Sequence, residues 1–97
     1  MAASSLFLTV HARPLADRRD EARELLAEMV AASLAEDGCE LMEFVASEDS
    51  DEWLVFERWA SRPQWERHAA TDRNARDGAR LAPMLAEPLA LRFFVTA

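Results

Sequence analysis

The chain has 97 residues, 51% of them hydrophobic and 30% charged, and carries a formal net charge of −7 at pH 7. That length allows one domain, and the balance of apolar and charged residues is that of a globular protein, not of a disordered or fibrous one. The acidic excess argues against nucleic acid and anionic membrane surfaces as partners, because both carry negative charge themselves.

Cysteine usage and the first residues bear on the compartment. Cys39 is the only cysteine, so no internal disulfide can form and we expect a reducing environment. The N-terminal segment lacks the basic stretch and the long apolar run of a signal peptide. No segment approaches the roughly 18 apolar residues of a transmembrane helix. These features predict a cytoplasmic protein.

The first third of the chain predicts a strand and a helix. Residues 6–12, LFLTVHA, are apolar and favour a strand that Pro14 ends. Asp17 is expected to cap a helix, because its side chain can accept hydrogen bonds from the first backbone amides. Between residues 22 and 34 the apolar positions recur at helical spacing, which predicts an amphipathic helix. Gly38 is expected to end it at the C′ position, where glycine is unstrained.

Two further strands are predicted at residues 41–47 and 53–61, and the short polar segment between them favours an antiparallel hairpin. Each strand has one apolar side and one mixed side that is still largely apolar; Leu54 and Phe56, for example, share a side with Arg58. An antiparallel sheet with one face in water alternates more cleanly. We therefore expect helices to cover one face and a second copy of the chain to cover the other, in a homodimer.

The rest of the chain predicts a split helical region and a last strand. Ser61 begins an S-x-x-Q capping box, and the helix should extend to about residue 71. A second helical segment at residues 73–85 is weakened by a glycine and bent by a proline, and residues 89–95 form a strand. The order β-α-β-β-α-β predicts an α+β, ferredoxin-like domain with a four-stranded antiparallel sheet and a core at about residues 6–95.

Three side chains, and Glu57 as a fourth if it faces the same way, are expected to converge where the third strand meets the following helix. Helical spacing directs Trp65 and His68 toward the sheet, and the period of two places Glu57 and Trp59 on one side of the strand. His68 is either a hydrogen-bonded core histidine or a general base, a role that suits the side chain titrating nearest neutral pH. The tryptophans are either core residues or pocket walls.

Other polar residues also allow two interpretations. A carboxylate inside a sheet covered on both faces needs a partner, so Glu57 either pairs with Arg92 or faces the pocket. Thr9 and His11, on the first strand, form either a polar edge pair or part of a substrate site. Cys39 is expected to be an inert buried thiol. The spacing of histidines, cysteine and glycines matches no zinc, haem-attachment or phosphate-loop motif, so an enzyme of this sequence would work without metal or nucleotide cofactor.

Three motifs, taken in order, resemble those of the antibiotic biosynthesis monooxygenase family, which consists of small ferredoxin-like proteins that dimerise as α+β barrels. The matching residues lie in the turn after the first helix, at the end of the third strand and on the next helix: Glu36, Gly38 and Cys39; Glu57 and Trp59; His68 and Thr71. The resemblance implies oxidation of an aromatic polyphenol or quinol-like molecule by molecular oxygen, without a cofactor. It implies His68 and Trp59 as catalytic residues.

The resemblance also implies substrate contacts from Trp65, Glu57, Thr9, His11 and Arg73. Some positions depart from the family: Arg73 stands near a position where a second histidine is common, no tyrosine is present, and Thr9 stands where the haem-degrading branch has an asparagine. The last departure argues against haem degradation. Two alternatives stay open, an isomerase that enolises its substrate with the same histidine and a non-catalytic dimeric module that binds a hydrophobic ligand.

Overall fold

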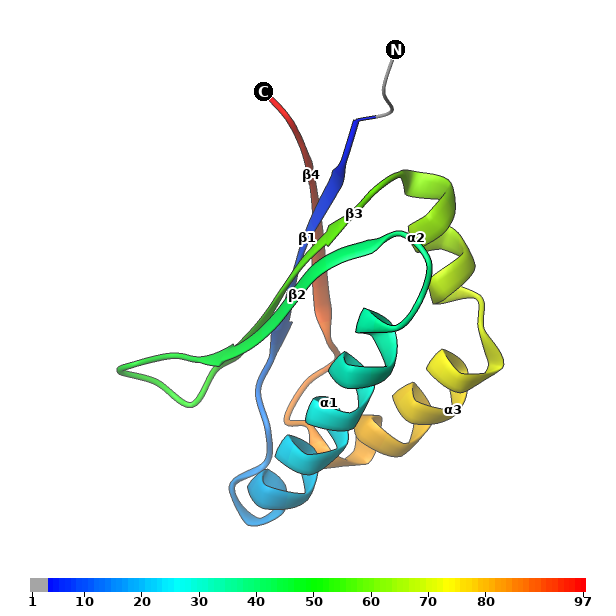
Figure 1. The fold of residues 1–97 in the computed structure, drawn as a ribbon. Coiled ribbons are helices and arrows are strands. Elements are labelled where there is room, and N and C mark those ends of the chain that lie inside the picture. The colour runs from blue at the N-terminus through cyan, green and yellow to red at the C-terminus, as the bar shows by residue number, and fades with distance from the viewer. Residues whose placement is uncertain (1–3) are drawn as a thin grey trace.

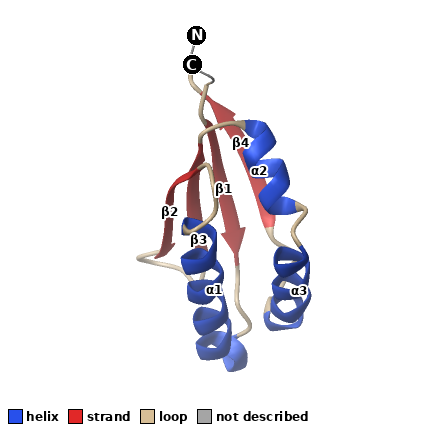
Figure 2. Cartoon of the chain, turned by 45° about the vertical axis from the view of Figure 1, so that its right-hand side comes forward, coloured by secondary structure: helices blue, strands red, loops and turns tan. Residues whose placement is uncertain are grey.

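A computed structural model describes residues 4–97 and shows a sheet with helices on one side (Figures 1 and 2). Its strands are β1 (Leu6–Ala12), β2 (Cys39–Ala46), β3 (Trp53–Trp59) and β4 (Ala90–Val95); its helices are α1 (Arg19–Leu34), α2 (Arg62–Ala69) and α3 (Asp72–Leu81). This is the predicted ferredoxin-like α+β order with a split second helical region. Within residues 4–97, no helix is long and apolar enough to cross a membrane.

The sheet is antiparallel in the order β2-β3-β1-β4. The predicted hairpin of β2 and β3 is therefore confirmed. β1 is an interior strand, in which Thr9 is paired with Phe56 on one side and with Arg92 on the other. The expectation that Thr9 and His11 form an edge pair is wrong, because β4 crosses over to cover the free side of β1.

The core lies between the sheet and the helices. Along β1 every second side chain faces the helices and is buried, as the period of two requires: Leu6, Leu8, Val10 and Ala12. On β3 the same face carries Trp53 and Trp59, at 1% and 0% exposure. Leu25 and Leu26 of α1 belong to this core, which confirms the predicted amphipathic helix.

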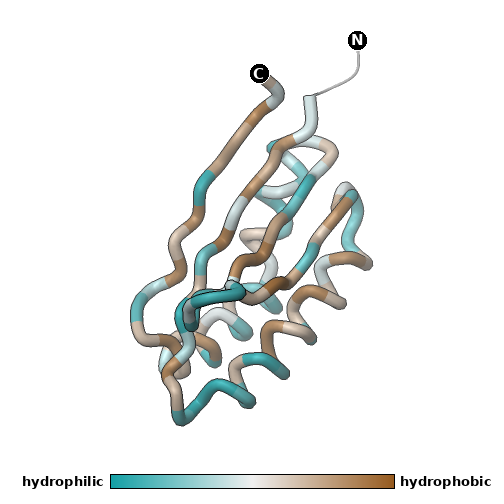
Figure 3. The backbone as a smooth tube through the Cα atoms, turned by 90° about the vertical axis from the view of Figure 1, so that its left-hand side faces the viewer, coloured by the Kyte–Doolittle hydropathy of each residue, from teal (hydrophilic) through white to brown (hydrophobic). Residues whose placement is uncertain are grey.

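The opposite face of the sheet is largely apolar and has no helix over it (Figure 2). Phe94 on β4 is 49% exposed and Val45 on β2 is 45% exposed, while Phe56 and Leu54 of β3 are partly exposed. Figure 3 views the molecule from this side and shows apolar stretches along the strands. The predicted mixed but largely apolar side of each strand is present, and no part of the described chain covers it.

Two predicted details of α1 are wrong. Asp17 does not cap the helix but lies in a 3-10 turn, Ala16–Arg18, that precedes it. The chain is fixed at this point because the Leu15 amide donates to the Met84 carbonyl at 2.9 Å. Gly38 is not the C′ residue, because i→i+3 hydrogen bonds already close the helix after Leu34. Gly38 instead has φ +90° in the turn that leads into β2.

The N-terminal caps of α2 and α3 explain where the second helical region is interrupted. Ser61 caps α2 as predicted: its hydroxyl oxygen accepts a hydrogen bond from the backbone amide of Gln64 at 3.4 Å. Thr71 caps α3 in the same way, accepting from the Asn74 amide at 3.1 Å. The split therefore falls at residues 70–71. Pro83 lies in a 3-10 turn, Ala82–Met84, that follows α3.

Candidate functional site

A cavity of about 300 Å³ lies between the helices and the sheet. Its volume is at the lower end of the range for small-molecule pockets. Most of its walls are apolar: Val10, Leu26, Val30, Met42, Val55 and Leu91. Two ionisable side chains, Glu57 and His68, also line it. An apolar cavity with a few convergent polar groups is the usual form of a ligand site.

Helix α2 presents His68 to this cavity. Trp65, His68 and Ala69 all line it, whereas Glu66 and Arg67 are exposed to solvent. This arrangement confirms the helix face predicted from the spacing. The Ser61 cap fixes where α2 begins, and so fixes which residues of the helix face inward.

The imidazole of His68 is held from two directions. Its Nδ1 atom lies 2.8 Å from Oε2 of Glu36, and its ring stacks on Trp59 with centroids 4.7 Å apart and planes tilted by 35°. A carboxylate only accepts hydrogen bonds, so Nδ1 carries the proton and Nε2 of the neutral ring keeps a lone pair. Among the described residues, no partner binds Nε2. The side chain is thus held with Nε2 directed away from Glu36.

Glu57 is the second ionisable group of the cavity and is only 6% exposed. Its Oε1 atom accepts a hydrogen bond from the indole N–H of Trp59 at 2.8 Å. Burial raises the pKa of Glu57 above its usual value, and the Trp59 hydrogen bond and nearby His68 only partly oppose this. Arg92 is not its partner, because Arg92 is paired with Thr9 and so lies on the other face of the sheet. The structure therefore places Glu57 at the pocket.

The two tryptophans occupy different places. Trp65 lines the cavity and meets the Phe93 ring edge-on, with centroids 4.8 Å apart. Trp59 is fully buried behind His68 and Glu57 and does not line the cavity. Trp59 therefore supports both ionisable side chains, and Trp65 is the indole that a bound molecule can touch.

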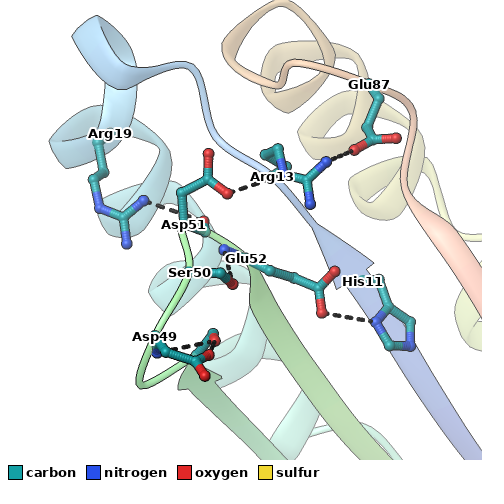
Figure 4. Close-up of polar contacts among 9 residues, drawn as sticks. His11, Arg13, Arg19, Asp49, Ser50, Asp51, Glu52 and Glu87 are labelled. Atoms are coloured by element: carbon teal, nitrogen blue, oxygen red, sulfur yellow. Dashed lines mark hydrogen bonds and ion pairs between the residues drawn. The ribbon is translucent and has the colours of Figure 1, made fainter.

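Thr9 and His11 do not line this cavity. They alternate with Val10, which faces the cavity, so both point to the opposite face of the sheet. His11 Nδ1 lies 3.4 Å from Oε1 of Glu52, within a surface network of polar contacts (Figure 4). The hydroxyl oxygen of Thr9 is buried without a hydrogen-bond partner among the described residues.

Arg73 lies beside His68 but does not line the cavity of about 300 Å³. It lines a recess of about 20 Å³ together with Glu36, His68 and Asp77. Its Nε atom is 3.4 Å from Oδ2 of Asp77, and most of its side chain is exposed. The structure thus brings His68, Glu57, Trp59 and Trp65 together, leaves Arg73 at the rim, and separates Thr9 and His11 from them.

Sequence reasoning missed three polar residues of the site. Glu36 stands out in the sequence only as a residue of the turn motif that resembles the family, and no local spacing could pair it with His68. Asn74 lines the cavity while its amide donates to the Ala69 carbonyl at 3.2 Å. Ser33 also lines it, bonded to the Met29 carbonyl at 2.7 Å. Ser33 did leave a signal, since it is the one polar residue on the apolar face of α1.

Cys39 adjoins the acidic part of the site without facing the cavity. Burial, reinforced by Glu57 and Glu36, raises the pKa of its thiol to about 11. The thiol is therefore protonated at neutral pH and is a poor nucleophile. Within residues 4–97, no three His, Cys, Asp or Glu side chains are grouped so as to hold a metal ion.

Comparison with known proteins places this geometry in a family. The sequence profile described as antibiotic biosynthesis monooxygenase matches residues 6–76, which include β1 to β3, α2 and His68. The chain belongs to the antibiotic biosynthesis monooxygenase family. The matched segment contains Glu36, Glu57 and Trp59 as well, so the whole group around His68 falls within the family domain.

Individual proteins resemble this chain in sequence or in architecture. The Mycobacterium tuberculosis protein Rv0793 is 32% identical over 78 residues, which cover 80% of this chain and 77% of that protein. The solved structure of Rv0793 matches with a TM-score of 0.91, covering 97% of this chain and 96% of that one at 28% identity. A Bacteroides thetaiotaomicron protein matches with a TM-score of 0.89 at 25% identity, covering 98% and 100%. PA3566 of Pseudomonas aeruginosa, at 19% identity and a TM-score of 0.88 over 100% and 98% of the two chains, shares the fold.

Proposed function

We propose that this antibiotic biosynthesis monooxygenase domain is a cofactor-free, cytoplasmic enzyme that oxidises an aromatic polyphenol or quinol-like molecule with molecular oxygen. The observation that carries the proposal is the Glu36–His68 pair at the wall of an apolar cavity. Oxygen reacts with electron-rich carbanions and phenolates, so such an enzyme must remove a proton and keep the resulting anion dry. The base and the apolar walls supply these two conditions.

In the first step, Nε2 of His68 takes the proton from an acidic O–H or C–H group of the bound substrate. Glu36 then stabilises the imidazolium through a charge-assisted hydrogen bond at Nδ1. For a ring methylene flanked by aromatic rings, the carbon loses two hydrogens and gains a carbonyl oxygen from oxygen, and the second oxygen atom leaves as water. The equation R₂CH₂ + O₂ → R₂CO + H₂O balances without an external reductant.

Glu57 and the tryptophans support this step. The raised pKa of Glu57 favours its protonated form, which can donate a hydrogen bond to the oxygen on which negative charge develops. Trp59 holds Glu57 and stacks on His68, so it positions both groups. Trp65 packs against the substrate ring. Arg73 adds positive charge at the rim.

The exposed apolar face of the sheet supports a homodimer. Phe94 and Val45 are nearly half exposed there, and a monomer rarely leaves such a face in water. Phe94→Asp should produce monomers in sedimentation experiments, whereas Leu34→Asp, at an exposed leucine of α1, should leave the dimer intact. A monomeric wild-type protein would contradict the dimer.

Oxygen uptake by metal-stripped protein tests the function, with anthrone- and quinol-type substrates. His68→Ala should lower the rate at least about tenfold, the low side of general-base contributions. Arg67→Ala, on the solvent side of the same helix, should not. An unchanged rate in His68→Ala would remove the histidine from the mechanism. Solvent deuterium incorporation without oxygen uptake would indicate the isomerase, and absence of both would indicate the ligand-binding module.

A further inference from the structure

A glycine in the middle of α3 has no conformational or steric reason to be there. Glycine destabilises a helix interior relative to alanine. Gly38 is the only glycine with positive φ among the described residues, so the backbone at Gly78 is one that any residue adopts. A Cβ atom built at Gly78 would meet no atom within 4 Å. The space beside this residue is therefore empty.

Gly78 lies where two hollows meet. It lines the cavity that contains His68, and it also lines a second hollow of about 400 Å³. Leu89 likewise lines both. The second hollow is lined by the end of α3 and the segment that leads into β4. Figure 2 shows α3 on the β4 side of the sheet. A longer side chain at position 78 would project into the junction.

The second hollow is apolar. Its walls are formed mainly by aliphatic residues: Leu81, Ala82, Leu85, Ala86 and Pro88. Among the described residues that line it, Glu87 alone is charged, and its carboxylate is bound by Arg13 at 2.6 Å (Figure 4). Because that carboxylate already has a cationic partner, the hollow offers no free charge to a ligand and suits an uncharged hydrocarbon group.

We propose that the two hollows form one elongated binding site for an aromatic phenol or quinol that carries an aliphatic side chain. The ring occupies the cavity beside His68 and Glu57, and the chain passes Gly78 and Leu89 into the second hollow. The missing side chain at Gly78 keeps this passage open. The identity of the ring as a reacting phenol rests on the proposed function, whereas the binding of the chain does not depend on turnover.

The free energy of burying methylene groups gives the expected effect. A fully buried methylene tightens binding about fourfold, and one that is half buried in an open groove tightens it about twofold. Dissociation constants of 2-naphthol and its 6-methyl to 6-hexyl derivatives can be measured by calorimetry under nitrogen, so that no turnover occurs. For the wild type, affinity should rise about twofold per methylene over the first members of the series.

Substitutions at the junction and in the second hollow complete the test. Gly78→Leu should abolish the dependence of affinity on chain length across the naphthol series, and Gly78→Ala should keep most of that dependence. Ala82→Glu, which places a charge in the second hollow, should also reduce the dependence on chain length. It provides an independent test in case the leucine variant does not fold. Chain-length dependence that is absent in the wild type, or unchanged in Gly78→Leu and Ala82→Glu, would overturn the inference.

The outcome can be separated from that of the proposed function. Chain-length dependence without oxygen uptake would contradict only the monooxygenase, and oxygen uptake without chain-length dependence would contradict only the elongated site. Failure of 2-naphthol and all its derivatives to bind would overturn both.

Discussion

The side chain of Glu36 accepts a hydrogen bond from His68 across 32 positions of sequence, at 2.8 Å. The contact connects the turn after α1 to the helix α2, so a hydrogen bond joins two elements that pack on the same face of the sheet. The histidine is 13% exposed and the glutamate 31% exposed at their side chains. The pair is thus partly shielded from water, where a carboxylate orients and stabilises an imidazolium more strongly.

Glu36→Gln should show whether Glu36 acts by orienting the His68 ring or by its negative charge. The amide oxygen can still accept a hydrogen bond from Nδ1, but it cannot balance the positive charge that forms on His68. We expect kcat to fall about tenfold or more while KM stays within about threefold, the pattern of an interaction made mainly in the transition state. Glu40→Gln, at an exposed glutamate that binds Arg58, is the control. An equal effect of both substitutions would indicate a general loss of acidic charge.

Glu57 should make the folded protein less stable as the pH rises. Its pKa is raised in the folded state above the ordinary value of 4.5, so folding favours the protonated form. This contribution is fully present below the ordinary value and is lost as the pH rises through the folded-state value. A tenfold difference in proton affinity between the folded and unfolded chains corresponds to about 1.4 kcal/mol of folding free energy.

Glu57→Gln removes this pH dependence and leaves an oxygen that can accept the Trp59 hydrogen bond. In urea unfolding, the variant should gain stability relative to the wild type as the pH rises above the ordinary value of 4.5, since it has no carboxylate to ionise. A stability difference that is constant over this range would show that Glu57 ionises freely in the folded state.

Gly38→Ala should destabilise the fold by about 1–3 kcal/mol, the usual cost of forcing a side chain into a sparsely populated backbone region. At φ +90°, the new Cβ atom would lie 2.6 Å from Cδ of Gln64. Gly78→Ala is the matched control, and should raise stability by up to about 1 kcal/mol because its Cβ meets no atom. Thermal unfolding of the two variants checks that the first substitution lowers stability and the second raises it. A Gly38→Ala protein as stable as the wild type would contradict the observed turn.

Cys39 should react slowly with iodoacetamide at pH 8. Its pKa of about 11, against an ordinary 9.0, leaves it with a thiolate fraction roughly a hundredfold below that of a free cysteine. The rate in the folded protein should rise steadily toward pH 11, whereas the urea-unfolded chain should react at the ordinary rate. Equal rates for folded and unfolded protein at pH 8 would contradict this prediction.

Local patterns in the sequence predicted most of the fold. The period of two located β1 without error and the capping box located the start of α2, because both depend on neighbouring residues. The start of α1 was misplaced since a distant carbonyl, that of Met84, holds the chain at Leu15. The sequence patterns also predicted that His68, Glu57 and Trp65 lie close together, as they do in the structure. That step required only the spacing within a strand and a helix.

Long-range relations could not be predicted in this way. The pairing of Glu36 with His68 depends on how α2 packs beside the end of α1, which no spacing encodes. Arg92 was a reasonable partner for Glu57 by charge, but the register of β4 on β1 places it opposite Thr9, on the other face. Burial of Trp59 behind the imidazole likewise follows from packing, since an indole near a histidine in sequence fits a wall or a support equally well.

The ionisable side chains and the far end of the cavity are formed by different residues. Trp59 contacts both His68 and Glu57, so a substitution there would disturb the two ionisable groups at once. The far end, around Gly78 and Leu89, touches neither group through any described hydrogen bond or ring contact. Under the proposed function, descendants of this protein could therefore acquire new substrates by exchanging residues at that end, with the chemistry inherited unchanged.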